Sequence, residues 1–386
     1  MKMYGLVMLL SVLLLMGCKK ESSFVRQEQR DGYTVTSFSI PEAQPEQGSM
    51  KLTEVMENAR IVPLETPDDC LIGWGAKYYI GSSYILVFQE EYIALFDGEG
   101  HFERIVARRG RGPEEYVNCV DFCVDEKNEL LFVLETYPKG KLKSYHLQDS
   151  TYFKQIEMIE SRRLNAVESL DNGDFLLAYS PSKETKYLYC QQTLSGELID
   201  SVSCHSMQEG FFTPRRLLQK VGDSYRYYSW GDMHSDDTVF NISSNGFQPQ
   251  WVFDYTAVKK YSIMGETPSY LFFDFNLLKN ETEEIANGAS WINVDFDTQH
   301  FCYHKKNGNL MRIDGFSDDY FSGRDWSFEQ AHIQGGRIFY IAASAMDLSK
   351  AIDKNPVQAK YADHWEKVIA NWNENNNPVL LIGELK

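Results

Sequence analysis

A turn recurs along this chain at a nearly constant interval, and that interval limits the possible folds more than any other feature. Each copy of the turn comes just before a short alternating apolar segment. The copies lie near Gly100 (FDGEGHF), Ser150 (HLQDSTYF), Gly196 (QTLSGEL) and Gly246 (ISSNGFQ), 46 to 50 residues apart. A period of about 40 to 50 residues with several strands in each unit is typical of the blades of a β-propeller.

The segments between these turns have the pattern of antiparallel strands. In the first unit, residues 76–107, the alternating stretches AKYYI, YILVF, YIALF and FERIVA are separated by short turns. A similar order of stretches follows in residues 117–158 and again in residues 164–203. Short alternating runs predict strands, and helical periodicity is nearly absent before residue 350, so we expect an all-β fold.

Two further units complete the expected ring. A fifth unit covers residues 292 to about 314, with its turn near Gly308, after an insertion rich in Asn and Glu. A sixth unit has expected strands at Gly336–Ala343 and Val379–Leu385, and the alternating segment Tyr33–Ile40 is expected to supply a missing strand. Joining the chain ends in one blade would remove the exposed edges of an open sheet. We therefore predict a six-bladed β-propeller of four-stranded antiparallel blades.

The N-terminus has the pattern of an export signal. After Lys2, the apolar run Met3–Met16 is shorter than the roughly 20 residues that a spanning helix needs, and it suits a secretory signal. The following LMGC, which ends at Cys18, resembles the bacterial lipobox. This resemblance implies that the thiol of Cys18 receives a diacylglyceryl group and that the chain is cut just before it. The alternative is an ordinary signal peptide, or an uncleaved anchor with an incidental cysteine.

These observations predict the organisation of the whole chain. Residues 1–17 would be the lipoprotein signal peptide, 18–32 a flexible tether, and 33–386 a single propeller domain. Apolar residues at helical spacing in Val357–Trp372 predict one insertion helix within about residues 350–375. Lys19 stands where an Asp would suggest retention at an inner membrane. The lipobox resemblance therefore implies an outer-membrane lipoprotein that faces either the periplasm or the cell surface.

The sequence contains no pattern that requires a metal or a cofactor, and we expect neither. His300 and His304 lie in a strand-like interval, about 13 Å apart on one face, and are expected at an edge or on the surface. The Asp171–Asp174 segment (DNGD) is interpreted as a hairpin turn rather than a calcium loop. Six cysteines follow Cys18 without a CxxC pair, and we interpret them as buried free thiols.

One dense basic cluster stands out, VARRGRGPEEYVN at residues 106–118. It connects the last strand of one expected blade to the first strand of the next. Its side chains either lock this corner through ion pairs or present guanidinium groups to a carboxylate, sulfate or phosphate. The candidate binding residues are Arg108, Arg109, Arg111, Glu114, Glu115 and Tyr116.

The same cluster carries a resemblance to a known family. The matching segments are Pro63–Thr66, Leu71–Gly73, Gly110–Tyr116, Asp121–Asp125, Asp236–Phe240 and Asn377–Leu380. Together they resemble the six-bladed β-propeller lipoproteins of the Bacteroidetes, which are similar to NHL-type propellers. Glu114 stands where that family commonly has a Gly. The resemblance implies the fold and the compartment but no catalytic residues.

The expected function is that of a tethered binding or scaffold protein in the cell envelope. The formal net charge of −17 disfavours nucleic acid and anionic membrane surfaces as partners, so the membrane is reached only through the lipid anchor. Aromatic segments at residues 211–216 and 225–230 would suit a glycan fragment, a peptide or an envelope protein. The alternative is a lyase or hydrolase with its active site at the axial funnel.

Overall fold

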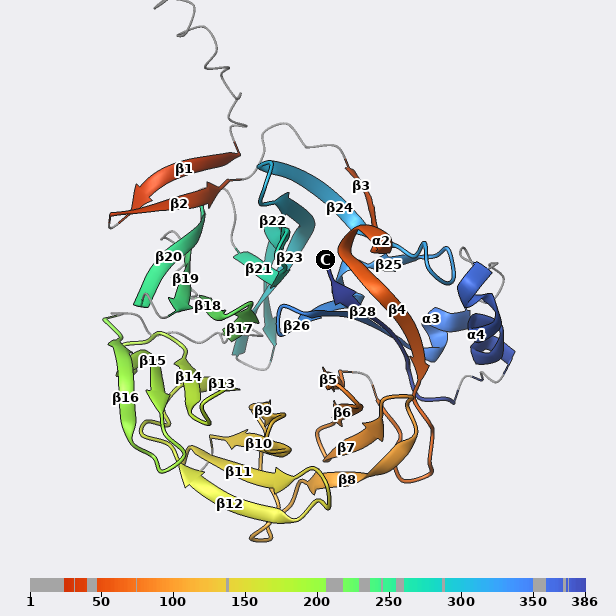
Figure 1. Cartoon of the computed structure of the whole chain (residues 1–386). Helices are drawn as coiled ribbons and strands as arrows, with labels where there is room; N and C mark the ends of the chain where they lie inside the picture. Colours follow the sequence, from red (N-terminus) through yellow and green to blue (C-terminus); the bar gives the residue numbers. More distant parts are fainter. Residues whose placement is uncertain are drawn as a thin grey trace, which may run out of the picture.

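The described strands form six sheets arranged radially around a common axis (Figure 1). The computed structural model describes residues 24–386 except 31, 40–46, 74, 137–138, 206–217, 229–236, 244–245, 255–259, 287–288, 350–358, 371–372 and 374. The blades are antiparallel and most have four strands, so the all-β prediction and the β-propeller prediction are confirmed at this level.

Three blades contain only four consecutive strands each. The first comprises β5 (Lys77–Ile80), β6 (Tyr84–Phe88), β7 (Tyr92–Asp97) and β8 (Phe102–Arg108). The second comprises β9 (Asp121–Asp125), β10 (Leu130–Glu135), β11 (Lys141–His146) and β12 (Tyr152–Glu157). The third comprises β13 (Leu164–Ser169), β14 (Phe175–Tyr179), β15 (Tyr187–Gln192) and β16 (Leu198–Ser203). In each blade the first strand lies nearest the axis and the last lies at the rim (Figure 1).

Two more blades are widened by strands from other parts of the chain. The fourth comprises β17 (Leu218–Val221), β18 (Ser224–Tyr228), β19 (Asp237–Ser243) and β20 (Gly246–Phe253). It is extended at β20 by the hairpin of β1 (Val25–Arg30) and β2 (Tyr33–Phe38). The fifth comprises β21 (Lys260–Glu266), β22 (Tyr270–Ala286), β23 (Ala289–His304) and β24 (Asn309–Ser317), with β3 (Gln47–Lys51) and β25 (Asp325–Ser327) paired to β24.

The last sheet joins the two ends of the chain. It comprises β26 (Ala331–Gln334), β27 (Ile338–Ala343), β28 (Val379–Leu385) and β4 (Met56–Pro63). The prediction that chain ends share one sheet is confirmed, but the strand assigned to it was wrong. Tyr33–Phe38 pairs with β20 instead, and β4 completes the sheet. The prediction of a six-bladed propeller is corrected: five blades consist of consecutive strands, and the remaining sheet is composite.

The recurring turn has the same backbone conformation in each of the five blades of consecutive strands. Gly100, Ser150, Gly196, Gly246 and Gly308 all have positive φ, between 62° and 95°. Each belongs to the connection between the third and fourth strands of its blade. Such φ values are open to glycine and closed to most other residues, which explains why the period is visible in the sequence.

The hydrophobic core lies between neighbouring sheets. In one of these interfaces Phe132 of β10 packs edge-on against Phe175 of β14, with ring centroids 4.8 Å apart. Trp365 and Val368 of α4 (Ala359–Ala370) are buried against the interface that contains β4 and β27. The predicted insertion helix is therefore present. It is accompanied by the short helices α2 (Leu52–Val55), α3 (Ala345–Ser349) and the 3-10 turn η1 (Phe328–Gln330). No helix in the described part of the chain has the length and apolar character needed to cross a bilayer.

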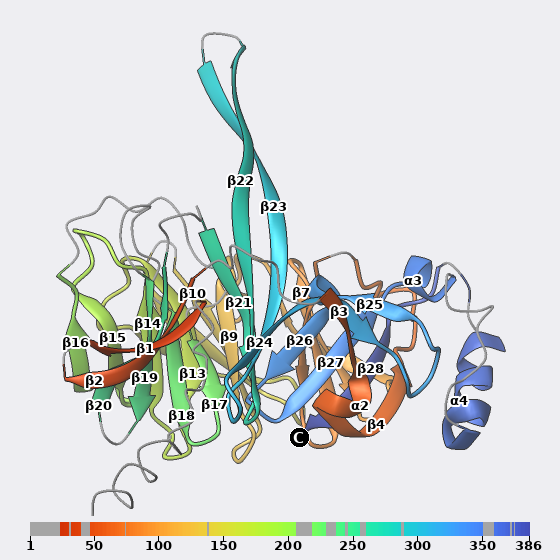
Figure 2. The same cartoon turned by 90° about the horizontal axis from the view of Figure 1, so that it is seen from above.

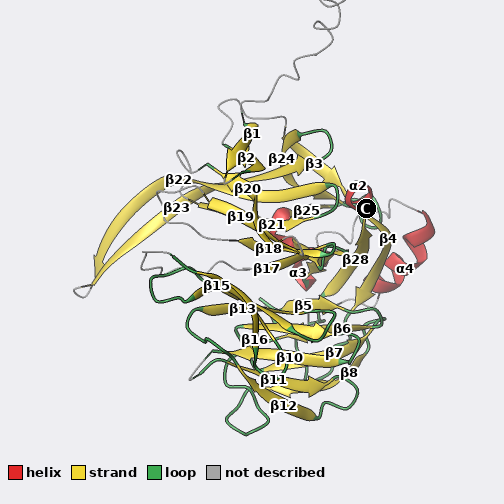
Figure 3. Cartoon of the chain, turned by 60° about the vertical axis from the view of Figure 1, so that its left-hand side comes forward, coloured by secondary structure: helices red, strands yellow, loops and turns green. Residues whose placement is uncertain are grey.

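The Asn- and Glu-rich insertion of the fifth unit is a long hairpin. β22 pairs with β21 only as far as Asn276, whereas its pairing with β23 continues to Ala286 and Ala289. The hairpin therefore extends ten residues beyond its own blade, about 30 Å at the rise of a β-strand. It projects from one face of the propeller (Figures 2 and 3).

The tether prediction differs from the structure at one place. Residues 18–32 were expected to be flexible, but Val25–Arg30 forms β1 and pairs with β2 along its whole length. The first 23 residues, including the signal peptide and Cys18, lie outside the described residues.

Candidate functional site

The basic cluster is a closely bonded corner between the first two blades. It leaves β8 at the rim and leads to β9 near the axis (Figure 1). The amide of Gly110 donates to the Tyr116 carbonyl at 2.9 Å, and the amide of Tyr116 donates to the Arg108 carbonyl at 3.1 Å. These bonds close the GRGPEE segment into a compact loop.

Glu115 and Tyr116 hold the loop from inside. A carboxylate oxygen of Glu115 accepts a hydrogen bond from the Gly112 amide at 2.8 Å. A Cβ at Gly110 would lie 1.8 Å from the same oxygen, so a larger residue there would displace the Glu115 carboxylate. Tyr116 is fully buried, and burial raises the pKa of its phenol well above the ordinary value. The Glu115 carboxylate bonds within the loop and the Tyr116 hydroxyl donates to carbonyls of the β6–β7 turn, so both functional groups are already in use.

Two side chains of the second blade donate hydrogen bonds to carbonyl groups of the loop. Lys143 donates to the carbonyls of Pro113, at 3.0 Å, and Glu115. The hydroxyl of Tyr145 donates to the Glu114 carbonyl at 2.8 Å. Lys143 is buried, and this burial lowers the pKa of its ammonium group. The corner is thus built into the packing of two blades, which supports its interpretation as a structural element.

The three arginines of the cluster have different surroundings. Arg109 forms ion pairs with Glu90, at 2.5 Å, and Glu91, at 3.5 Å, in the β6–β7 turn. Arg108 and Arg111 are exposed, and neither has an ion-pair partner within the described residues. Anion binding at this corner stays a prediction, and the guanidinium groups of Arg108 and Arg111 would bind the anion.

A second set of matching segments meets at the chain ends. The side-chain amide of Asn377 donates to the carbonyls of Glu65, at 2.7 Å, and Cys70, at 2.8 Å. Its side-chain oxygen accepts from the Ile72 amide at 2.7 Å, and its own backbone amide donates to Thr66. The PLET and LIG segments therefore bond to the NPVL segment, which lies about 305 residues away in sequence. We call this set of contacts beside β28 and β4 the clasp.

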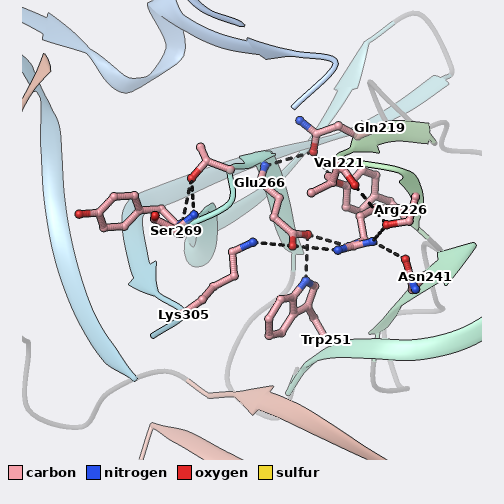
Figure 4. Close-up of polar contacts among 12 residues, drawn as sticks. Gln219, Val221, Arg226, Asn241, Trp251, Glu266, Ser269 and Lys305 are labelled. Atoms are coloured by element: carbon pink, nitrogen blue, oxygen red, sulfur yellow. Dashed lines mark hydrogen bonds and ion pairs between the residues drawn. The ribbon is translucent and has the colours of Figure 1, made fainter. Parts of the chain in front are cut away.

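A buried charge network between the fourth and fifth blades was not anticipated from the sequence (Figure 4). Glu266, at the end of β21, is 1% exposed and forms a two-point ion pair with Arg226 of β18, with distances of 2.8 and 3.0 Å. Lys305 lies 2.8 Å from the same carboxylate, and the Trp251 indole donates to it at 3.1 Å. The members come from β18, β20, β21 and the turn after β23, so no local pattern could have grouped them.

The charges in this network determine the protonation of Glu266. Burial by itself would raise the pKa of the carboxyl group, but the cations Arg226 and Lys305 hold that pKa below its ordinary value. A carboxylate with two cations and an indole N–H has its acceptor sites occupied. We therefore assign the network a structural role in docking the two blades.

The prediction that His300 lies at an edge or on the surface was wrong. It belongs to β23, between β22 and β24, and its ring contacts two carboxylates. Nδ1 is 2.7 Å from Asp274 and Nε2 is 3.3 Å from Glu329, while the ring stacks on Phe328. Although burial opposes the charged form, the two acids raise the pKa of His300 to about 9.

The remaining candidate residues belong to the two aromatic segments, 211–216 and 225–230. Tyr225, Tyr227 and Tyr228 lie in β18 and are buried, so they do not present a ligand surface. Residues 211–216 and 229–230 lie outside the described residues. Among the described residues, no three His, Cys, Asp or Glu side chains are grouped so as to hold a metal ion.

The radial sheets and the clasp between the chain ends define a β-propeller protein. Sequence comparison matches residues 35–384, nearly the whole chain, to the family described as Domain of unknown function (DUF4934), and the protein belongs to this family. A search of curated proteins gave no match.

Solved structures include similar folds. The BF0058 protein of Bacteroides fragilis NCTC 9343, whose name marks it as a candidate exported protein, has a TM-score of 0.61 and 15% identity over 91% of this chain and 99% of that chain. At this identity the likeness shows the fold alone. The WD40 domain of Neurospora crassa Pan2 has a TM-score of 0.40 and 7% identity over 79% of this chain and 74% of that chain. The relation to NHL-type propellers stays a prediction.

Proposed function

We propose that this protein is a tethered protein-interaction scaffold of the cell envelope, built on a closed ring in which the composite sheet acts as the sixth blade. The observation that carries the scaffold role is the β22–β23 hairpin. Its two paired strands extend ten residues beyond their blade and away from the body of the propeller. The same scaffold role would also include binding of glycan fragments or peptides.

The charge of the hairpin favours a particular kind of partner. Residues 279–297 contain Glu281, Glu283, Glu284, Asp295 and Asp297 but only one basic residue, Lys279. Within the described side chains, Lys279, Asp295 and Asp297 are exposed. An acidic arm on an acidic protein favours association with a basic surface and disfavours self-association.

Export and lipidation are part of the proposal. The LMGC sequence at Cys18 supports an outer-membrane lipoprotein, and the name of the B. fragilis structure is consistent with export. Metabolic labelling with a palmitate analogue tests this directly. The wild-type chain should take up the label and fractionate with membranes, and Cys18→Ala should do neither.

Site-specific photo-crosslinking in the producing cell tests the scaffold role. A crosslinking residue at Asp297 on the hairpin should give discrete adducts. The matched control is Glu103, an exposed acid on β8 at the rim of the first blade. If Asp297 and Glu103 give the same adducts, or if neither gives any, the hairpin is not the interaction arm.

A further inference from the structure

The rim of this propeller accepts additional strands, and the chain itself occupies two of the available positions. β2 pairs in parallel with β20, through Thr36 to Phe38. β3 pairs in parallel with β24, through Gln47 to Lys51. In both cases a segment from outside the blade extends its outermost strand.

The rim strand of the third blade is open. β16 is the last strand of its sheet, and no strand within the described residues pairs with its outer side. Natural edge strands are usually protected by Lys or other charges. β8 carries Glu103, Arg104 and Arg108, whereas Asp200 is the single charged residue of β16.

Apolar side chains are exposed at this edge. Leu198 and Ile199 are 44% and 50% exposed, and Leu194 in the preceding turn is 36% exposed. These are three of the nine large hydrophobic residues that are exposed in the described part of the chain, so they form a local group rather than a scatter. A register shift places Ile199 in a β-bulge, which leaves the regular ladder of β16 at Asp200–Val202.

The surface beside this group is hollowed. Two shallow, open depressions of about 390 Å³ each both include Leu194 and Ser195 in their lining. One is lined by the Asn172–Asp174 turn and Lys154, and the other by residues 155–159 at the end of β12. An open ladder, exposed apolar side chains and adjacent hollows therefore coincide at one place on the rim.

We propose that β16 is a docking site for an extended segment of a partner polypeptide, added in parallel as β2 and β3 are added to their blades. Backbone hydrogen bonds to Asp200–Val202 would supply affinity, and apolar side chains of the segment would pack on Leu194, Leu198 and Ile199. Glu197 and Asp200 are exposed beside the ladder, so the segment would be basic. A second copy of this chain is disfavoured because it would bring the same acids together on a protein of net charge −17.

This inference rests on the proposed scaffold role but uses a surface remote from the hairpin. The probe is a fluorescent six-residue peptide, acetyl-Lys-Val-Thr-Ile-Lys-Val-amide, followed by fluorescence anisotropy and by hydrogen exchange of the protein. Binding should slow exchange at residues 198–203. Ile199→Lys should weaken binding at least about tenfold, because it places a cation where the basic segment docks. The control Met346→Lys changes an exposed side chain on α3 and should leave binding unchanged.

Thermal unfolding and the position of protection separate lost binding from other effects. Wild-type and Ile199→Lys proteins should have the same melting temperature, which separates lost binding from lost folding. Protection elsewhere, equal binding by both variants, or a wild-type dimer that Ile199→Lys abolishes would overturn the proposal. A variant whose hairpin is shortened at Leu277 should still bind the peptide, so failure of the hairpin experiment and failure at β16 are distinguishable.

Discussion

The side-chain amide of Gln334 makes two hydrogen bonds to the backbone of Ile80. Its nitrogen donates to the Ile80 carbonyl at 2.8 Å, and its oxygen accepts from the Ile80 amide at 2.7 Å. Gln334 ends β26 and Ile80 ends β5, so this pair joins the innermost strands of the composite sheet and the first blade. The pair lies where the composite sheet meets the first blade. It uses the amide and carbonyl of Ile80, which no neighbouring strand among the described residues pairs.

Gln334→Ala should lower the free energy of unfolding by about 1–3 kcal/mol, because it leaves both backbone groups of Ile80 without their partner. Urea denaturation followed by fluorescence measures the change. Gln148→Ala, at an exposed glutamine that bonds to Glu129 on the surface, is the matched control and should change stability by less than about 0.5 kcal/mol. Equal effects of the two substitutions would contradict a role for Gln334 in ring closure.

Glu266→Gln should destabilise the protein by about 3 kcal/mol at pH 7, because removal of the carboxylate leaves Arg226 and Lys305 without their anion. The folded-state pKa of Glu266 is below its ordinary value. The stability that the ionised Glu266 contributes is therefore present above the unfolded-state pKa, and it is lost as pH falls through the folded-state pKa. The stability difference between wild type and Glu266→Gln should shrink below about pH 4, and a pH-independent difference would argue against this ion pairing.

His300 should give the opposite pH dependence. Its folded-state pKa of about 9 exceeds the ordinary value of 6.5. Its ion pairs with Asp274 and Glu329 therefore contribute fully below pH 6.5 and are lost as pH rises through about 9. Melting temperatures of wild type and His300→Gln between pH 6 and pH 10 test this. The curves should converge at high pH, and parallel curves would show that the imidazolium is not bound by these acids.

The corner loop predicts contrasting effects of two neighbouring substitutions. Gly110→Ala should cost about 1–3 kcal/mol, because the new Cβ displaces the Glu115 carboxylate from the Gly112 amide. Arg111→Ala should change stability by less than about 0.5 kcal/mol, since its side chain is exposed. Chemical denaturation of both variants checks this, and a large loss of stability in Arg111→Ala would mean that this arginine is part of the corner.

The same Arg111→Ala variant separates the two interpretations of the basic cluster. Wild type and variant are compared on arrays of carboxylated, sulfated and phosphorylated ligands. If the cluster binds anions, a ligand bound by the wild type should be lost by the folded variant. Unchanged binding would leave only the structural role.

Some of this architecture was predictable because it depends on local chemistry. The turns at Gly100, Ser150, Gly196, Gly246 and Gly308 need positive φ, and each is followed by an alternating strand, so the repeat could be read without a structure. The compact corner at residues 106–118 was visible for a similar reason, in its glycines and proline. The assignment of Tyr33–Ile40 to the closing blade failed because alternation identifies a strand but not its neighbour.

The order of residues by itself determined the strand period, the four-stranded unit and the export-like N-terminus, because each depends on residues close together in the chain. Only the tertiary structure decided that β4 completes the composite sheet, that Glu266 meets Arg226 and Lys305, and that the described residues leave the outer edge of β16 open. These features arise between segments up to 329 residues apart. Their pairing depends on which surfaces the packed blades bring together, and no local pattern carries that information.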